Sequence, residues 1–200
     1  MYSGHAEAMF LQPVIGHTLA FGPIDDPPGG RAYSLADQVL AELTWSKLDG
    51  AVRIETDGGV WRVRLDGLRI IRGVVQGPAG AWDLLYAGSL CEGVALTRAG
   101  ERFDLFRQVD PEHGLWLGID DDSGGGVLRT TGRVSSAGIW SEVLVTPDAR
   151  YRKAVWPLLF LWGGLRVLGE HHLWLRMTSW ATSKRAAAHA LDALAARLAS

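Results

Sequence analysis

One apolar segment constrains the fold of this chain more than any other feature. Residues 154–169 read AVWPLLFLWGGLRVLG. The segment is too apolar for a helix with one face in water, and it is shorter than the ~20 apolar residues that a comfortable membrane span needs. We therefore expect other parts of the same chain to cover it.

The residues before this segment predict a series of short β-strands. Apolar and polar side chains alternate along residues 39–45, 52–56 and 61–65, which is the two-residue period of a strand with one buried face. Asp57-Gly58-Gly59 marks a tight hairpin turn, because glycine supplies the positive φ that such a turn needs. Further strands are expected at residues 68–75, 82–86, 93–97, 102–109, 115–119, 127–131 and 139–146, the first of them apolar on both faces.

These patterns predict a mainly β (α+β) fold. Short strands at this spacing, separated by Gly, Pro or Asp clusters, are typical of an antiparallel meander closed as a barrel or packed as a sandwich. We expect residues 31–168 to form this domain, with the sheet surrounding a buried helix at residues 155–168. Pro157 suits the first turn of that helix, where its missing N–H is not needed.

The two ends of the chain are expected to lie outside the barrel. Residues 1–30, which include the loop sequence DDPPGG, are interpreted as an arm lying on the domain or on a partner, with a disordered tail as the alternative. Residues 169–200 predict a strand at 172–180 and an amphipathic helix at 184–199. The apolar stripe of that helix comprises Ala187, Leu191, Leu194 and Leu198.

Composition narrows the possible functions of this 200-residue chain. The net charge is −2 and no block of like charges occurs, which argues against nucleic-acid binding, since that needs a basic surface. Cys91 is the only cysteine, so neither an intrachain disulfide nor a thiolate metal cluster can form. The N-terminus lacks the pattern of a signal peptide, so the cytoplasm is the expected compartment, with the periphery of a membrane as the alternative.

Three groups of residues invite a chemical interpretation. Residues 120–125 (DDDSGG) resemble part of a calcium loop but fail at its fifth and twelfth positions, so a hairpin turn is favoured. Glu170 and His172 could share one face of a strand, but a metal site needs a third ligand that the sequence does not supply. Cys91 needs a histidine partner to act as a nucleophile, and a buried structural thiol is favoured. The sequence therefore predicts no catalytic, cofactor or metal residue.

Four segments resemble a loose family of bacterial proteins of about this size and of unknown function. They are LAELTWSK at residues 40–47, TDGGVWRVRLDG at 56–67, GLWLGIDDDSGG at 114–125 and VWPLLFLWGGLRVL at 155–168. That family is in turn similar to the tubby, scramblase and LURP-one group. The resemblance implies a β-barrel closed around a hydrophobic C-terminal helix. It assigns no catalytic residue, and residues 1–30 and the residues after 168 have no counterpart in it.

The sequence leaves three functional hypotheses open. The first is a non-enzymatic interaction or scaffold module that binds a protein partner or associates with itself, through Trp174, Trp180, Leu191, Leu194 and Leu198. The second is a barrel that binds anionic lipid headgroups through Arg62, Arg64, Arg69 and Arg72. The third is an enzyme that holds a small molecule inside the barrel.

Overall fold

The computed structural model describes residues 14–24, 30–67, 69–110, 114–135, 138–151, 153–171 and 183–199. Within these ranges the chain forms twelve strands, a short 3-10 helix (η1, Ala149–Tyr151) and two α-helices. The strands are Thr18–Pro23 (β1), Arg31–Leu35 (β2), Gln38–Ser46 (β3), Ala51–Thr56 (β4), Gly59–Asp66 (β5), Ile71–Gln76 (β6), Trp82–Gly88 (β7), Gly93–Thr97 (β8), Arg102–Asp110 (β9), Gly114–Asp121 (β10), Gly126–Ser135 (β11) and Gly138–Val145 (β12).

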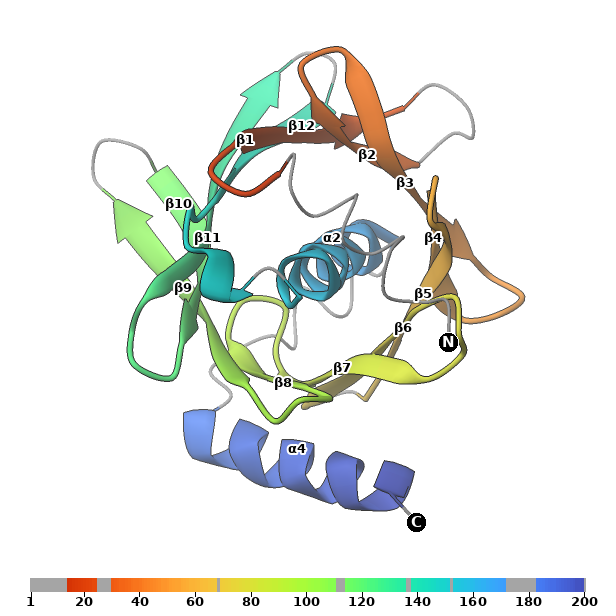
Figure 1. Ribbon diagram of the computed structural model, residues 1–200, viewed down its shortest axis with the longest axis vertical. Coiled ribbons are helices and arrows are strands. Elements are labelled where there is room, and N and C mark those ends of the chain that lie inside the picture. Colours follow the sequence, from red (N-terminus) through yellow and green to blue (C-terminus); the bar gives the residue numbers. More distant parts are fainter. Residues whose placement is uncertain are drawn as a thin grey trace.

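The strands form one closed antiparallel barrel in which each strand pairs with its neighbours in sequence. Closure comes from β1, whose Leu19 lies opposite Val143 of β12 and whose Phe21 lies opposite Tyr33 of β2. Figure 1 shows β1 between β12 and β2 at the point where the ring closes. A closed ring leaves no unpaired edge strand, which removes the usual route to edge-to-edge aggregation. The prediction of a mainly β fold is confirmed, and the barrel replaces the sandwich alternative.

The predicted boundary of the N-terminal arm is wrong. Residues 18–23 are a barrel strand rather than part of an arm, and β2 begins the ring's second hairpin at a position where no strand was predicted. In the sequence, Gly22 and Pro23 suggest that no strand continues through them. In the structure they are the last two residues of β1, where the strand ends. Pairing with β12, which lies more than a hundred residues away, stabilises β1. The arm interpretation of residues 1–13 lies outside the described residues.

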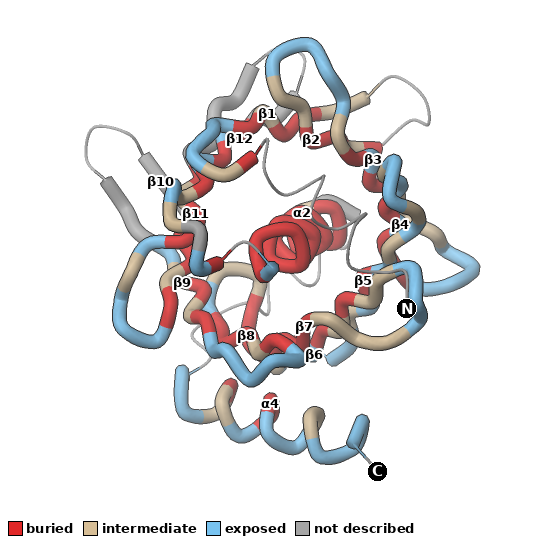
Figure 2. Tube along the Cα trace, in the orientation of Figure 1, coloured by how far each residue is buried: buried red, intermediate tan, exposed pale blue. Residues whose placement is uncertain are grey.

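The helix α2 (Val155–His171) begins at the predicted residue and extends three residues beyond the predicted end. Its apolar side chains are buried all round the helix, and they join the inward-facing side chains of the strands in one core. Figure 2 draws α2 in the middle of the ring of strands, with nearly its whole length coloured as buried. α2 packs most closely on β3 to β7.

Two adjacent glycines let α2 approach the strands. A Cβ at Gly163 would lie 2.7 Å from Leu43 and 3.0 Å from the Tyr33 hydroxyl, and a Cβ at Gly164 would lie 2.9 Å from Val63. The close approach allows the Tyr33 hydroxyl to donate a hydrogen bond of 2.5 Å to the Leu159 carbonyl oxygen. Burial raises the pKa of Tyr33 well above its ordinary value, so the hydroxyl remains a donor.

The second helix, α4 (Lys184–Ala199), has the predicted bounds and lies on the outside of the barrel. The Ser183 side chain caps it by accepting a hydrogen bond of 3.2 Å from the Ala186 N–H. α4 packs on β7 and β8, with a smaller contact on β6. These strands are therefore covered on both faces.

The predicted two-sided burial falls on the wrong strand. The sequence places it at residues 68–75, but β6 alternates, with Arg72 exposed between the buried Ile71 and Gly73. Two-sided burial occurs instead in β7, whose consecutive residues 84–88 are all buried, and in β8. The reason is tertiary, since α4 covers the outer face of β7 and β8.

Candidate functional sites

Residues 120–125 form the end of β10 and the hairpin turn that leads into β11, as the favoured interpretation predicts. One carboxylate oxygen of Asp121 accepts hydrogen bonds from the Ser123 N–H at 3.0 Å, the Ser123 hydroxyl at 2.8 Å and the Gly125 N–H at 2.6 Å. Gly124 adopts a φ of 82°, a left-handed conformation that glycine adopts without strain. The acidic side chain therefore organises its own turn, a common role of aspartate in tight turns.

Asp121 also joins this turn to the segment that leads into α2. Its second carboxylate oxygen accepts a hydrogen bond from the hydroxyl of Tyr151 in η1. This bond, followed by those from Ser123 and Gly125, lowers the pKa of Asp121 to about 2. The same bond raises the pKa of Tyr151 to about 12. The pair is a buried, charge-assisted anchor at the entrance to α2.

Cys91 lies in the connection between β7 and β8 and is half-buried. Burial raises the pKa of its thiol, although the charges of Arg107 and Arg166 act in the opposite direction. The Ser89 hydroxyl oxygen accepts hydrogen bonds from the N–H groups of Cys91 and Glu92, at 3.3 and 3.1 Å. A raised pKa keeps the sulfur protonated at neutral pH, which is the opposite of what a nucleophilic cysteine needs.

The structure brings no metal-ligand set together in the part of the chain that it describes. No group of three His, Cys, Asp or Glu side chains lies close enough to hold an ion there. The structure places Glu170 and His171 in the last turn of α2 and describes neither side chain, and His172 lies outside the described residues. The sequence idea of a metal site at Glu170 and His172 therefore stays untested.

The apolar stripe of α4 is occupied within the chain. Ala187, Ala190 and Leu191 are buried against Leu85 and Ala87 of β7 and Val94 of β8. Leu194 packs at the border of this cluster, whereas Leu198 is 45% exposed. The prediction that Leu191 and Leu194 form an open partner surface is therefore corrected, because the barrel itself covers them. Trp174 and Trp180 lie outside the described residues.

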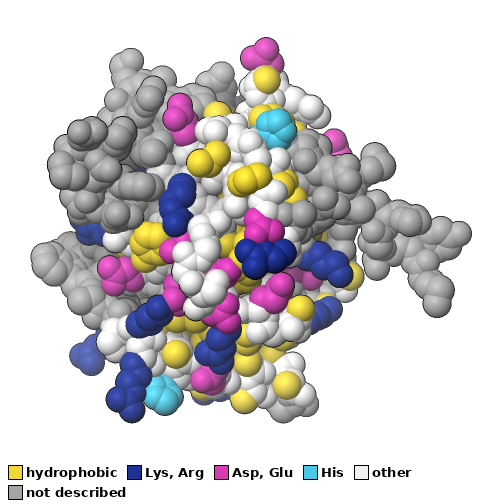
Figure 3. All heavy atoms as spheres, turned by 60° about the vertical axis from the view of Figure 1, so that its left-hand side comes forward, with side chains coloured by type: hydrophobic (Ala, Val, Ile, Leu, Met, Phe, Trp, Pro, Cys, Tyr) yellow, Lys and Arg dark blue, Asp and Glu magenta, His cyan; other side chains and the backbone are white. Residues whose placement is uncertain are grey.

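Two ion pairs flank this apolar contact, and both use β9. Arg102 donates to the Asp192 carboxylate at 2.7 Å, and Lys184 pairs with Asp104. Sequence reasoning missed Arg102 and Asp104, since nothing near them in the sequence indicates a helix that lies ninety residues away. Figure 3 shows acidic and basic side chains interspersed over the face of the molecule that it draws, rather than a patch of one sign.

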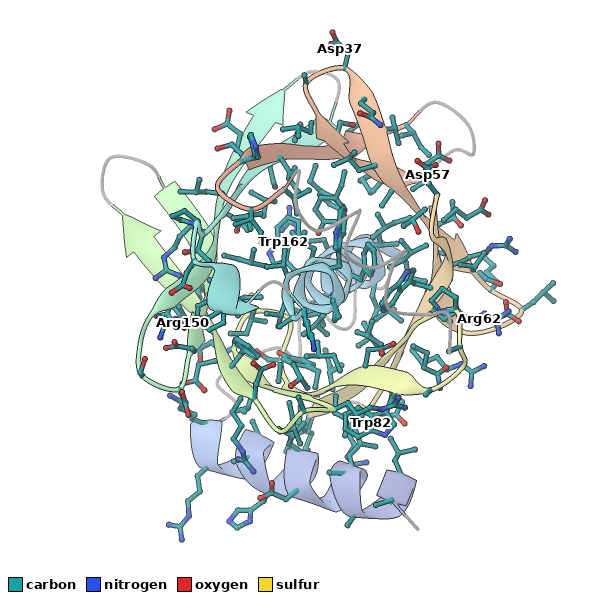
Figure 4. All side chains as sticks on the ribbon, in the orientation of Figure 1. Asp37, Asp57, Arg62, Trp82, Arg150 and Trp162 are labelled. Atoms are coloured by element: carbon teal, nitrogen blue, oxygen red, sulfur yellow. The ribbon has the colours of Figure 1, made fainter. Side chains whose placement is uncertain are left out.

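The four arginines predicted to bind lipid are all exposed on or beside β5 and β6. Figure 4 shows Arg62 pointing away from the barrel. Arg62 lies directly opposite Arg53 of β4, and Arg72 lies opposite Asp66. Arg53 pairs with Glu55 at 3.0 Å, but among the described residues no ion pair involves Arg62, Arg64 or Arg72. Because like charges opposite each other destabilise a sheet, the Arg53–Arg62 pairing is unusual.

Aromatic rings in the core form two groups on α2. Trp162 packs edge-on against Phe21 at 4.9 Å between ring centroids, and Phe160 packs against Trp61 at 5.1 Å and Trp156 at 5.3 Å. Figure 4 places Trp162 inside the ring of strands. Trp156 and Trp162 are thus part of the core and Trp61 packs against it, whereas the side chain of Trp116 lies outside the described residues.

Comparisons with known proteins find no relative. The chain matches no protein-family model, no curated protein sequence and no solved structure. The resemblance to the tubby, scramblase and LURP-one group therefore stays a prediction. Within the described residues, no helix has both the length and the apolar character needed to cross a membrane.

Proposed function

We propose that this protein is a non-enzymatic interaction module in which α2 fills the interior of the barrel and the C-terminal extension makes contacts. The observation that carries the proposal is the composition of the core. In that core, apolar side chains of α2 and of the strands bury one another. A close-packed interior of this kind makes the barrel rigid, so we expect partners to bind on its outer surface.

The extension is the best-supported contact region. Leu198 is exposed on α4, and two tryptophans, Trp174 and Trp180, lie in the segment that joins α2 to α4. Tryptophan is among the residues that contribute most binding energy at protein interfaces. Leu191 and Leu194 hold α4 on the barrel, so they support this surface and do not form it.

Sedimentation velocity of the full chain over a hundredfold range of concentration tests the proposal. We expect self-association that weakens at least about tenfold when Trp174 and Trp180 are both changed to Ser, as loss of two interface anchors implies. The matched control is Leu48→Ser, because Leu48 is 99% exposed but lies in the turn between β3 and β4. A monomer at every concentration, or equal weakening by the control, would contradict the proposal.

A second candidate function rests on the exposed arginines of β5 and β6. We infer that Arg62, Arg64 and Arg72, together with Arg69, bind anionic lipid headgroups. The support is that Arg62, Arg64 and Arg72 lack an ion pair among the described residues, whereas Arg102, Arg150 and Lys184 each have one. Surface arginines near a membrane contribute about 1 kcal/mol each.

Flotation with phosphatidylserine vesicles tests this candidate. We expect the protein to bind them at low salt and not to bind neutral phosphatidylcholine vesicles. Arg62→Glu with Arg64→Glu should abolish binding, whereas Arg185→Glu, a matched change on the exposed face of α4, should leave most of it. Recovery of no protein with anionic vesicles would remove the lipid function.

A further inference from the structure

Three arginines lie next to one another on the outer face of β4 and β5. Arg53 lies directly opposite Arg62, and Arg64, the next outward-facing residue of β5, lies opposite Ala51. All three arginines are exposed, and along their strands they alternate with residues that face the core. These four positions form one square of the sheet surface, which we call the arginine square. It has a guanidinium group at three corners and a methyl group at the fourth.

Contacts within the chain do not account for this arrangement. Like charges directly opposite each other destabilise a sheet, so the pairing of Arg53 with Arg62 has a cost. Among the described residues, Arg62 and Arg64 make no hydrogen bond, ion pair or ring contact that would offset it. Arg53 pairs through Nε with Glu55 at 3.0 Å, and Glu55 lies on the side of Arg53 away from Arg64. The positive charge of the square is therefore left for a group from outside the chain.

A phosphate group has the charge and the shape that fit the square. Each guanidinium group can donate two parallel hydrogen bonds to phosphate oxygens. Directly opposite residues of neighbouring strands have Cβ atoms about 5 Å apart, and residues two positions apart on one strand are about 7 Å apart. Three long arginine side chains at these spacings can reach one tetrahedral anion. Ala51 adds only a methyl group between them.

Acidic residues at both ends of the square favour a compact anion. Glu55 lies in the next row of β4, beside Glu42 of β3. At the other end, Asp66 follows Arg64 on the outer face of β5 and lies opposite Arg72. These carboxylates would repel an extended polyanion such as nucleic acid, which needs a continuous basic surface. A single phosphate group can lie between the arginines without reaching either end.

We propose that the arginine square binds a phosphate monoester, carried by a soluble small molecule or by a lipid headgroup. The inference deepens the second candidate function and rests on it, since Arg62 and Arg64 belong to both. It adds Arg53, and it requires a phosphate group where the lipid candidate requires only negative charge. A dianion between the arginines also removes their repulsion, so binding stabilises the folded protein.

Inorganic phosphate at pH 7.5 is the first probe, with sodium chloride at equal ionic strength as the reference. We expect phosphate to raise the melting temperature of the full chain, and calorimetry to give a dissociation constant of about 1 mM or tighter. Arg53→Gln and Arg62→Gln should each weaken binding at least about tenfold. The matched control Arg72→Gln changes an exposed arginine of β6 that lies opposite Asp66, and it should leave the dissociation constant within about twofold.

The melting temperatures of the same variants separate binding from a structural role. Because Arg62→Gln removes the repulsion with Arg53, it should raise the melting temperature in chloride by about 1–3 °C. It should also abolish the further rise that phosphate gives the wild type. If Arg62 instead supports the sheet, the variant will melt at a lower temperature in both buffers.

Vesicles distinguish the two sources of the phosphate group. Phosphatidic acid carries a phosphate monoester, whereas phosphatidylserine carries a diester. Stronger flotation with phosphatidic acid at equal surface charge, lost in Arg53→Gln, would assign the square to a lipid headgroup. Binding of inorganic phosphate without that preference would assign it to a soluble phosphate compound.

The arginine square would be overturned if phosphate acts no better than chloride, or if Arg53→Gln and Arg72→Gln lose binding equally. A lower melting temperature of Arg62→Gln in both buffers would also overturn it. The lipid candidate would survive these results if phosphatidylserine vesicles still bind the wild type and not the variant with Arg62→Glu and Arg64→Glu. The two failures are therefore distinguishable.

Discussion

The two helices of this protein pack in opposite ways, since α2 is surrounded by the barrel and α4 lies on its outer surface. α2 is apolar all round and buries nearly every side chain, from Val155 to Leu168. α4 is amphipathic and buries only three residues, while the rest of its surface faces solvent or the edges of the contact. A helix covered on every side must approach the strands closely, which the small residues Gly163 and Gly164 allow. A helix on the surface needs one apolar stripe, a capping residue and oppositely charged partners on the barrel. Five predictions, in decreasing order of effect, test how these two kinds of packing contribute to the stability of the protein.

The largest effect is expected in the core of α2. Phe160→Ala removes a fully buried ring that packs on Trp61 and Trp156, and it should lower the free energy of unfolding by about 3–5 kcal/mol. Urea denaturation followed by tryptophan fluorescence measures the change. A loss below about 1 kcal/mol would mean that Phe160 does not occupy a close-packed interior.

A smaller effect is expected where α4 meets the barrel. Leu191→Ala removes a buried side chain at a surface contact that can relax, so the loss should lie near ~2 kcal/mol, at the low end for such changes. Hydrogen exchange should show faster exchange in α4 first, with β1 to β5 unaffected. Uniform acceleration throughout the barrel would show that α4 belongs to the global folding unit.

Glycine and alanine should have opposite effects in the two helices. Gly163→Ala places a methyl group against Leu43 and Tyr33, and this overpacking should outweigh the gain in helix propensity, for a net loss of about 1 kcal/mol. In α4, where Ala193 is exposed, the reverse change Ala193→Gly should cost about 1 kcal/mol through propensity alone. Thermal unfolding measures both, and a stabilising Gly163→Ala would contradict the close approach of α2.

The anchor at the start of α2 should respond to acid. The folded-state pKa of Asp121 is lowered from 3.8 to about 2, so its contribution to stability is present above pH ~4 and is lost as the pH falls through 2. Asp121→Asn and Tyr151→Phe should therefore flatten the decline in melting temperature between pH 4 and pH 2. If the melting temperature of these variants falls as steeply as that of the wild type, other carboxylates cause the acid sensitivity.

The smallest effect belongs to the exposed charges that hold α4. A double-mutant cycle on Arg102→Ala and Asp192→Ala should give a coupling energy of at most about 1 kcal/mol, because both side chains are roughly half exposed. Salt should abolish it, whereas the Asp121–Tyr151 anchor should respond little. A coupling that persists in 1 M salt would mean that the pair is shielded from solvent.

Local patterns in the sequence predict most of the elements. The alternation around Asp57-Gly58-Gly59 predicts the β4–β5 hairpin, and the stripe beginning at Ala187 predicts the bounds of α4. The missing elements are β1 and β2. Their stability comes from partners across the ring, and Gly22 and Pro23 make the local pattern weak.

The candidate contact surface was harder to predict than the fold. The apolar stripe of α4 indicates that the helix packs against an apolar surface, but the stripe does not identify that surface. Arg102 and Asp104 read as ordinary solvent-facing positions of a strand. Only the folded chain shows that they meet Asp192 and Lys184.

The sequence by itself therefore determined that this chain is mainly β, that residues 155–168 must be covered, and that residues 184–199 form a helix with one apolar face. Only the tertiary structure decided that β1 closes the ring and that α4 covers β7 and β8. The physical reason is range. Periodicity and turn residues act over a few positions, whereas strand closure and helix docking depend on contacts between residues far apart in the chain, which many sequences with the same local pattern could arrange differently.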